Sequence, residues 1–368
     1  MNWLIAPNAF KGSLEADDAA DIIQKLIQER NKEDIVTTAP IADGGDGTCY
    51  LLNQQLGLKK FYARVSDPLG RAVDGFFGYD PITETAYLDV STVSGIKWLT
   101  PSELNPWLSS SFGTGELILE AIAKGAKNIV LGLGGSATID MGTGILSAMG
   151  VIFLDENNKE LSTHSAKFLQ KIKHIQIIEN IPSVSFTCLC DVSNPFFGDK
   201  GAIPVFGPQK GLKPEDHSLF LESAKAVYQL FEDISENDLH DQPSFGAAGG
   251  IALGLSAFFP TKMAQGAQFF FEKIGIEKMI AKADVIVTGE GRYDSQSEDG
   301  KGSYELLQLA KKYNKKVWLI TSGNEADEAG FDEVIKLANL DFNLPNIKNT
   351  AVDNLTIAFL EKLDKKGL

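Results

Sequence analysis

Residues 285–302, VIVTGEGRYDSQSEDGKG, combine residue types that could hold a charged ligand. A short run of β-branched residues, 285–287, leads into a loop with four glycines, four carboxylates, Arg292 and Lys301. A structural turn needs only one or two glycines to supply positive φ. The loop therefore predicts a place where the backbone closely approaches a ligand.

Acidic side chains in this loop and in two other loops are candidates for phosphoryl-transfer chemistry. That reaction needs acids to hold Mg²⁺ and to accept a proton from the attacking hydroxyl. An Asx turn would also explain Asp191, which precedes VSNP, and a helix cap would explain Asp46, which precedes GT. Those explanations are weaker for Asp43 and Glu290, which lie beside glycine. The candidates are Asp43, Asp46, Asp191, Glu290 and Asp294.

Two basic side chains lie at positions where they could bind an anion. Lys11, in AFKGS, lies between Phe10 and Gly12, just before Ser13, which we expect to cap a helix. A phosphate or carboxylate would be favoured beside that helix N-terminus. Arg71, in DPLGR, offers a guanidinium that can bind such groups in a bidentate manner. A solvated surface side chain is the alternative for each.

The segment NIVLGLGGSA, 128–137, is open to two functional interpretations. Gly132, Gly134 and Ala137 fit the dinucleotide pattern G-x-G-x-x-G/A after a strand, which would indicate an NAD-linked dehydrogenase. Alternatively, the glycines let backbone N–H groups converge on a phosphate, with Ser136 and Thr138 adding hydroxyl donors. A purely structural turn is the third possibility. The sequence contains neither a Walker A loop nor protein-kinase signatures.

Composition excludes several classes of function. The chain of 368 residues has 43% hydrophobic and 23% charged residues, which is typical of globular protein. Its net charge of −15 argues against nucleic acid or an anionic membrane surface as partner. The three cysteines show no metal-binding spacing, and neither a signal peptide nor a membrane span is indicated. We expect a cytoplasmic protein.

Short apolar runs alternate with amphipathic helical stretches, which predicts an α/β fold with a mainly parallel sheet. Helices are expected from Ser13 onward and over 114–125, and the length favours two domains. Five of the predicted strands end in the glycine-rich or polar loops, and ligands bind at that edge of open α/β sheets. The strands are predicted at 3–6, 35–39, 87–90, 128–131, 184–190, 284–288 and 317–321.

Together these loops resemble the bacterial type I glycerate kinases, over nearly the whole chain. The resemblance is carried, in order, by APNAFKGS, PIADGGDGT, SDPLGR, GTGELI, GLGGSATIDMGTG, CDVSNP, VFGPQKG, GAAGG and TGEGRYDSQSEDGK. It implies an enzyme that transfers phosphate from ATP, with Mg²⁺, to an alcohol group of D-glycerate, giving 2-phosphoglycerate. The implied partners are these small molecules.

The chain departs from the family pattern in three places. Asn8-Ala9 replaces the usual Asp-Ser, and residues 139–142, IDMG, replace Asn-Asp-Gly-Gly. Ser244 and Phe245 replace an earlier glycine. The charged residues and glycines discussed above are retained, so the resemblance still implies activity.

The resemblance also implies a domain arrangement and a site. Two α/β domains are expected, a Rossmann-like one from residues 1–90 and 289–368 and an inserted one from 91–288, with the active site in the cleft between them. It favours the phosphate or substrate interpretation of GLGGSA. An NAD-linked oxidoreductase and a non-catalytic metabolite-binding protein are the alternatives. The sequence pattern does not specify an oligomeric state or distinguish the C2 from the C3 hydroxyl.

Roles for individual residues follow from the chemistry of phosphoryl transfer. We expect Asp191 to be the general base, because an apolar strand before it should desolvate its carboxylate. Lys11, Arg71 and Lys301 are expected to handle negative charge. Asp294, Glu290 and Asp43 are the expected metal ligands. Substrate or phosphate contacts are expected from Ser13, Gly44, Gly45, Gly134, Gly135, Ser136, Thr138, Gly289 and Gly291.

Overall fold

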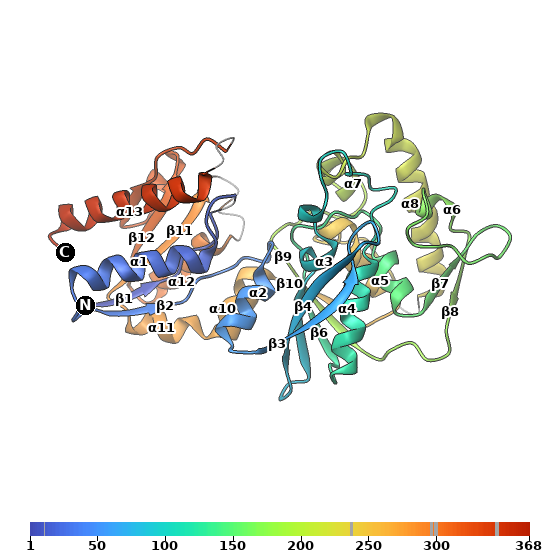
Figure 1. Ribbon diagram of the computed structural model, residues 1–368, viewed down its shortest axis with the longest axis horizontal. Helices are drawn as coiled ribbons and strands as arrows, with labels where there is room; N and C mark the ends of the chain where they lie inside the picture. Colours follow the sequence, from blue (N-terminus) through green and yellow to red (C-terminus); the bar gives the residue numbers. More distant parts are fainter. Residues whose placement is uncertain (11, 236–237, 295–296, 298–300, 343–345) are drawn as a thin grey trace. The chain divides into compact units, whose positions relative to one another are not determined.

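The structure is a computed structural model of residues 1–368 and describes all of them except 11, 236–237, 295–296, 298–300 and 343–345 (Figure 1). The chain forms two compact units. The first is made from both ends of the chain, Met1–Asp43 and Gln265–Leu368, and the second is Gly44–Ala264. Each has its own hydrophobic core.

A five-stranded parallel sheet forms the centre of the first unit, in the order β13-β12-β11-β1-β2. Helices connect the strands, as parallel pairing requires. The elements are β1 (Asn2–Ile5), α1 (Ala16–Arg30), β2 (Ile35–Thr38), α10 (Gly266–Ile274), α11 (Ile276–Lys282), β11 (Val285–Arg292), α12 (Gly302–Lys312), β12 (Lys316–Ser322), β13 (Glu333–Lys336) and α13 (Ile347–Lys366).

Helices cover both faces of this sheet because its strands are apolar on both sides. Alternate strand residues such as Ile5, Val287 and Ile320 share a core with apolar residues of α1 and α13. Helices α11 and α12 pack against β1, β11 and β12 from residues outside that core. The arrangement is the doubly wound one that the alternating pattern predicts.

The strand order reverses between β1 and β11. From β1 the chain passes through α1 to β2 on one side, whereas from β11 it passes through α12 to β12 on the other. Because the two connections leave in opposite directions, a crevice is expected at the carboxyl ends of β1 and β11.

The second unit contains a six-stranded mixed sheet, in the order β10-β9-β6-β5-β4-β3, and a separate β7-β8 hairpin. Strands β5, β6 and β9 are parallel, whereas β3, β4 and β5 form antiparallel pairs. The strands are β3 (Lys59–Ser66), β4 (Ala72–Asp80), β5 (Thr85–Asp89), β6 (Asn128–Gly132), β7 (Val151–Leu154), β8 (His174–Ile177), β9 (Ser185–Cys190) and β10 (Thr261–Gln265). The helices are α2 (Thr48–Gln55), α3 (Ser91–Ser94), α4 (Phe112–Ala123), α5 (Thr143–Ala148), α6 (Phe168–Lys171), α7 (Ala202–Phe206), α8 (His217–Ile234) and α9 (Ile251–Ser256).

Each of the seven predicted strands coincides with an observed one, which confirms the α/β class. The expectation of mainly parallel pairing is right for the first unit but wrong for half of the second, where hairpins build β3 to β5. The boundaries between the units also differ from the predicted ones after residues 90 and 288. The chain leaves the first unit after Asp43 and returns to it at Gln265. Residues 59–89 form β3, β4 and β5, which join β6 in one sheet because β5 pairs with β6, and so they lie in the second unit, whereas α10 and α11 pack on the first.

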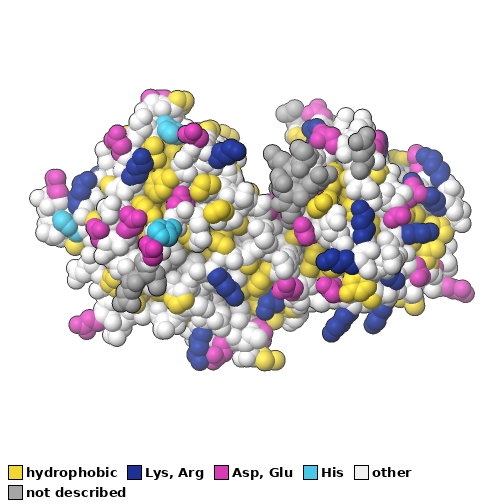
Figure 2. Space-filling view, turned by 180° about the vertical axis from the view of Figure 1, so that it is seen from behind, with side chains coloured by type: hydrophobic (Ala, Val, Ile, Leu, Met, Phe, Trp, Pro, Cys, Tyr) yellow, Lys and Arg dark blue, Asp and Glu magenta, His cyan; other side chains and the backbone are white. Residues whose placement is uncertain are grey.

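The charge on the surface is mixed. On the face shown in Figure 2, Lys and Arg side chains are interspersed with Asp and Glu over both units. No helix among the described residues is long and apolar enough to span a membrane.

Candidate active site

A cavity of about 450 Å³ lies in the first unit, at the carboxyl ends of β1 and β11. This is the reversal point of the strand order, where open α/β sheets bind ligands. Its lining combines apolar side chains with charged ones. The apolar group includes Phe10, Leu14, Leu337, Leu340 and Phe342, and the polar group includes Asn8, Ser13, Asp43, Glu290, Arg292, Asp294, Lys301 and Ser322.

Glu290, in this cavity, is a buried carboxyl with an unsatisfied oxygen. Only 5% of the residue is exposed, and Oε1 has no hydrogen-bond partner among the described residues. The other oxygen, Oε2, accepts a hydrogen bond from Ser297 Oγ at 3.2 Å. Desolvation raises the pKa of Glu290 to about 7, although the nearby Lys301 ammonium opposes the shift. A buried acid of this kind is suited to a cation or to proton transfer.

The predicted metal ligands Asp43 and Asp294 line the same cavity. Asn8 Nδ2 donates a hydrogen bond to Asp43 Oδ2 at 2.8 Å, and the Asn8 N–H donates to Gly289 O at 2.8 Å. Asn8, where the family pattern has aspartate, therefore ties the loop after β1 to the acid after β2. Asp294 lies 3.6 Å from Lys301 Nζ, in an ion pair. Within the described residues, no three acidic, histidine or cysteine groups are arranged to hold a metal by themselves.

The loop after β1 differs from expectation in one respect. Ser13 does not cap α1, because the helix begins at Ala16 and Ser13 Oγ instead donates to Phe10 O at 2.8 Å. The bond closes a tight turn that carries Ser13 into the cavity lining. The predicted Lys11 lies outside the described residues.

The two predicted glycines of β11 have different surroundings. A Cβ at Gly289 would lie 2.7 Å from Phe10 Cζ, so this glycine permits close packing of the loop after β1. Gly291 lines the cavity, and its carbonyl accepts a hydrogen bond from Ser322 Oγ at 2.5 Å. Gly291 is thus the one of the pair placed to meet a ligand.

In the second unit, three of the predicted loops meet at close range. A Cβ at Gly44 would lie 2.6 Å from the carbonyl carbon of Cys190, and its φ is +100°. A Cβ at Gly134 would lie 2.2 Å from the backbone nitrogen of Asp46 and 2.3 Å from the carbonyl carbon of Gly45. Only glycine permits these approaches. The glycines of 44–45 and 134–135 therefore bring the loops together beside the end of β9.

A second cavity, of about 250 Å³, lies where β6 and β9 end in this unit. Gly134, Gly135, Ser136 and Asp191 all line it, so the structure brings these four predicted residues together. Asp191 is half-buried and follows β9 directly. Thr138, also predicted, is fully buried behind the loop, and its Oγ1 has no partner among the described residues.

Lys210 is a lining residue that the sequence interpretation missed. It ends the short 3₁₀ helix Pro208–Lys210 and is only 4% exposed. Its Nζ donates to Ser136 Oγ and to Thr138 O, both at 2.8 Å. Desolvation lowers the pKa of Lys210 to about 7, although the carboxylate of Asp140 opposes the shift. The sequence feature that could have pointed to Lys210 is the turn GPQKG, in which proline starts the helix and glycine ends it.

Asp140 stabilises the glycine-rich loop internally. Its carboxylate accepts hydrogen bonds from Ser111 N and Ser111 Oγ at 2.8 Å and from the N–H groups of Gly142 and Gly144. With these donors saturating the carboxylate, the residue is committed to shaping the loop. The helix after this loop, α5, begins only at Thr143. The dinucleotide pattern needs a helix directly after its glycines, so the NAD interpretation is disfavoured.

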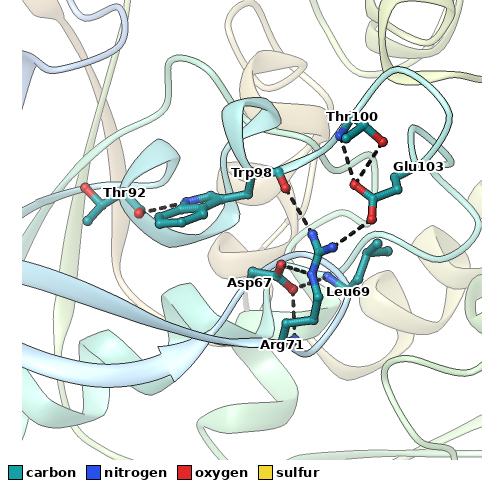
Figure 3. Close-up of polar contacts among 7 residues, drawn as sticks. All are labelled: Asp67, Leu69, Arg71, Thr92, Trp98, Thr100 and Glu103. Carbon is teal, nitrogen blue, oxygen red and sulfur yellow. Dashed lines mark hydrogen bonds and ion pairs between the residues drawn. The ribbon is translucent and has the colours of Figure 1, made fainter.

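Arg71 supports the protein's own structure (Figure 3). Its guanidinium binds Asp67 Oδ2 at 2.5 Å and Glu103 Oε1 at 2.7 Å, and Nη2 donates to Trp98 O at 3.0 Å. Trp98 Nε1 in turn donates to Thr92 O at 3.0 Å. Arg71 lines neither of the two cavities described above. The interactions tie the turn at 67–71 to the segment 92–103.

We expect Arg71→Ala to act mainly on stability. The nearly inaccessible Asp67 would lose its cation but keep the N–H donors of Leu69 and Arg71 at 2.8 and 2.9 Å. Because Arg71 is itself half exposed, the unfolding free energy should fall by about 1–2 kcal/mol. The melting temperature should fall by about 2–4 °C.

Thermal unfolding of Arg71→Ala beside Arg64→Ala is the measurement. Arg64 pairs with Asp74 at the exposed surface, so that variant should melt within about 1 °C of wild type. An unchanged melting temperature for Arg71→Ala, combined with a large loss of substrate affinity, would instead return Arg71 to the substrate site.

A model of the glycerate kinase family matches residues 3–361. A glycerate kinase of Haemophilus influenzae is 34% identical over 366 residues, which cover 96% of each chain. A glycerate 2-kinase of Escherichia coli is 34% identical over 90% of this chain and 87% of its own.

The fold agrees with these relatives. The crystal structure of a candidate glycerate kinase 2 from Salmonella typhimurium LT2 superposes with a TM-score of 0.84 at 30% identity, covering 100% of this chain and 98% of its own. With a family match over nearly the whole length and relatives above 30% identity, the chain belongs to the glycerate kinase family.

Proposed function

We propose that this protein uses ATP to phosphorylate D-glycerate and forms 2-phosphoglycerate. The observation that carries the proposal is the cavity at the strand-order reversal of the first unit, with apolar, cationic and acidic groups together. Such a combination of groups suits a nucleoside triphosphate. The names of the relatives, glycerate kinase and glycerate 2-kinase, support the acceptor and the position of transfer.

ATP is proposed to occupy the cavity of the first unit. Its base would lie against Leu337, Leu340 and Phe342, since nucleotide bases are held mostly by apolar contact. Its phosphates would lie near Ser13, Gly291 and Lys301, which supply hydrogen-bond donors and positive charge. Lys11 is proposed to add charge to the same group, and Gly289 to support the loop through its contact with Phe10.

The acids of this cavity fit a Mg²⁺ ion. Glu290 has a buried oxygen that none of the described residues hydrogen-bonds, and an ion would satisfy it. Mg²⁺ in nucleotide sites keeps several waters and takes only one or two carboxylates plus phosphate oxygens, so no cluster of three protein ligands is needed. We propose Glu290 as one ligand and Asp43 or Asp294 as the second. When bound, the ion would neutralise charge on the terminal phosphates.

The acceptor is proposed to bind in the cavity of the second unit. Gly134, Gly135 and Ser136 would contact it through backbone N–H and hydroxyl donors. Gly44 and Gly45 shape that loop by their close packing, and Thr138 supports it from behind.

Asp191 is proposed as the general base. Its carboxylate would accept the proton of the C2 hydroxyl as that oxygen forms a bond to the γ-phosphorus. The bond between the γ-phosphorus and the β,γ-bridging oxygen breaks, and ADP leaves with that electron pair. Asp191 lies in the same cavity as the glycine-rich loop, which is the placement that this role requires.

A single assay tests the function. The protein is incubated with ATP, MgCl₂ and D-glycerate, and ADP release is measured with and without the acid. We expect ADP release that depends on glycerate. An oxidoreductase would instead reduce NAD⁺ without ATP, and a non-catalytic protein would bind glycerate without turnover.

We further propose a cytoplasmic location, where ATP is abundant. The three cysteines are buried free thiols, which is compatible with a reducing compartment.

A further inference from the structure

The cavity of the second unit contains one deeply buried cation. Lys210 lines it together with Ser136 and Asp191, and its ammonium group has three protons to donate. Two of them are donated to neutral acceptors, Ser136 Oγ and Thr138 O. Within the described residues, Lys210 has no ion-pair partner within 4 Å, so its charge is hydrogen-bonded but not neutralised.

Burying an ammonium group in this way is unfavourable, and desolvation accordingly lowers the pKa of Lys210, so its placement needs a reason. The acid whose charge raises the pKa of Lys210 is Asp140, and its carboxylate is already held by Ser111 and by backbone N–H groups. A solvated surface position would suit a lysine that only braced a loop, and a neutral amide could make the same two hydrogen bonds. The charge itself is explained by an anionic group that enters the cavity and pairs with the third proton.

We propose that Lys210 binds the carboxylate of the acceptor and so makes the enzyme specific for a hydroxy acid. The inference rests on the proposed function and identifies the residue that selects the substrate class. The acceptor's carboxylate would lie between the Lys210 ammonium and the donors of Gly134–Ser136.

A carboxylate fits this place better than a phosphate. The cavity has about 250 Å³ and one lining lysine, and it also contains the carboxylate of Asp191. A phosphate group, with up to two negative charges, would be repelled by that acid and only half neutralised by Lys210. A small hydroxy acid places one negative charge at the lysine and leaves its hydroxyl for Asp191.

Lys210→Met tests the proposal, because methionine has a similar length and no charge. Removing a buried charge-assisted contact should raise the KM for D-glycerate by at least about 100-fold, while the KM for ATP stays within about twofold. Lys213→Met is the matched control, since Lys213 is exposed three residues away. That control should behave as wild type. Proportional loss of affinity for both substrates in Lys210→Met would overturn the proposal.

The pH dependence of the affinity for D-glycerate distinguishes carboxylate binding from a purely structural role of Lys210, which would leave this dependence unchanged. Lys210 must be protonated to bind an anion, and its pKa in the free protein is about 7. Affinity for D-glycerate should therefore be constant below pH 7 and weaken above it. The other titratable groups that face Lys210 are Asp140, Asp191 and the Cys190 thiol, whose pKa is raised by burial. Lys210→Arg, which stays charged, should lose the weakening, and a wild-type profile in that variant would contradict the proposal.

Ligand discrimination by the wild-type protein gives an answer even if the variants do not fold. Calorimetric binding of D-glycerate is compared with that of D-glyceramide, which has the same shape without the charge. We expect binding of the amide to be at least about 100-fold weaker. Equal binding of both would overturn the role of Lys210 and leave the kinase function intact, whereas D-glycerate binding without turnover would contradict the function and leave Lys210 as the carboxylate site.

Discussion

Asp191→Asn should lower kcat by about 10²–10⁴, the usual contribution of a general base. The substitution keeps the size of the side chain at the end of β9 and removes its ability to accept the acceptor's proton. The Mg²⁺ concentration that gives half-maximal rate should stay within about twofold, because Asp191 lines the cavity of the second unit and the proposed metal ligands lie in the first.

Steady-state kinetics at several Mg²⁺ concentrations check this expectation, with Asp199→Asn as the matched control. Asp199 is exposed in the segment that follows the same strand, so its variant should keep wild-type kcat. If excess Mg²⁺ restores the rate of Asp191→Asn, then Asp191 is a metal ligand and the base lies elsewhere.

Glu290→Gln should have the second large effect, on both metal use and stability. Loss of a buried carboxylate ligand should raise the Mg²⁺ requirement by about 10- to 100-fold. In the metal-free protein the same change should be stabilising. The folded protein binds the Glu290 proton more tightly than the unfolded chain does, because burial raises the pKa from 4.5 to about 7. Stability is therefore lost as pH rises through that window.

The size of the stabilisation follows from the shift. Above pH 7 the ionised Glu290 should lower the free energy of unfolding by up to about 3 kcal/mol, and the glutamine variant should not show this loss. Thermal unfolding in EDTA should show Glu290→Gln melting several degrees above wild type at pH 8 and close to it near pH 4.5. The exposed Glu361→Gln is the control and should show no difference at either pH. A destabilised Glu290→Gln at pH 8 would mean that the carboxylate is satisfied within the protein.

The strands and the chemistry-bearing loops were predictable because their signals are local. The run 285–287 is β-branched, stops at glycines and forms the first part of β11, with Glu290 and Gly291 at its end. Glycines at 44 and 134 were predicted to admit a ligand. The structure adds a second reason for both glycines, which is the approach of other backbone segments, at Cys190 and Asp46. Glycine in a loop thus marks close approach without saying what approaches.

The surroundings of Arg71 and Lys210 depend on contacts that are distant in the sequence. Arg71 binds Asp67 within DPLGR, but its other two partners, Trp98 and Glu103, lie about 30 positions along the chain, so the local sequence does not show how fully its guanidinium is occupied. Lys210 was overlooked because a lone lysine in a glycine-rich turn is usually solvated. Its burial is created by the loop at 136–138.

The boundaries between units were missed for a related reason. Strands β3 and β4 carry many polar residues and so lack the continuous apolar run of a buried parallel strand. They belong to the second unit only because β4 pairs with β5, which pairs with β6. Pairing of this kind is a long-range property, and composition alone does not reveal it.

We propose that the enzyme transfers phosphate from ATP to the C2 hydroxyl of D-glycerate. Coupling the reaction to enolase alone, which converts 2-phosphoglycerate to phosphoenolpyruvate, tests this transfer. We expect phosphoenolpyruvate to form at the rate of ADP release when ATP, MgCl₂ and D-glycerate are all present. ADP release that yields phosphoenolpyruvate only after phosphoglycerate mutase is added would place the transfer at C3, and no glycerate-dependent ADP release would contradict the kinase function itself.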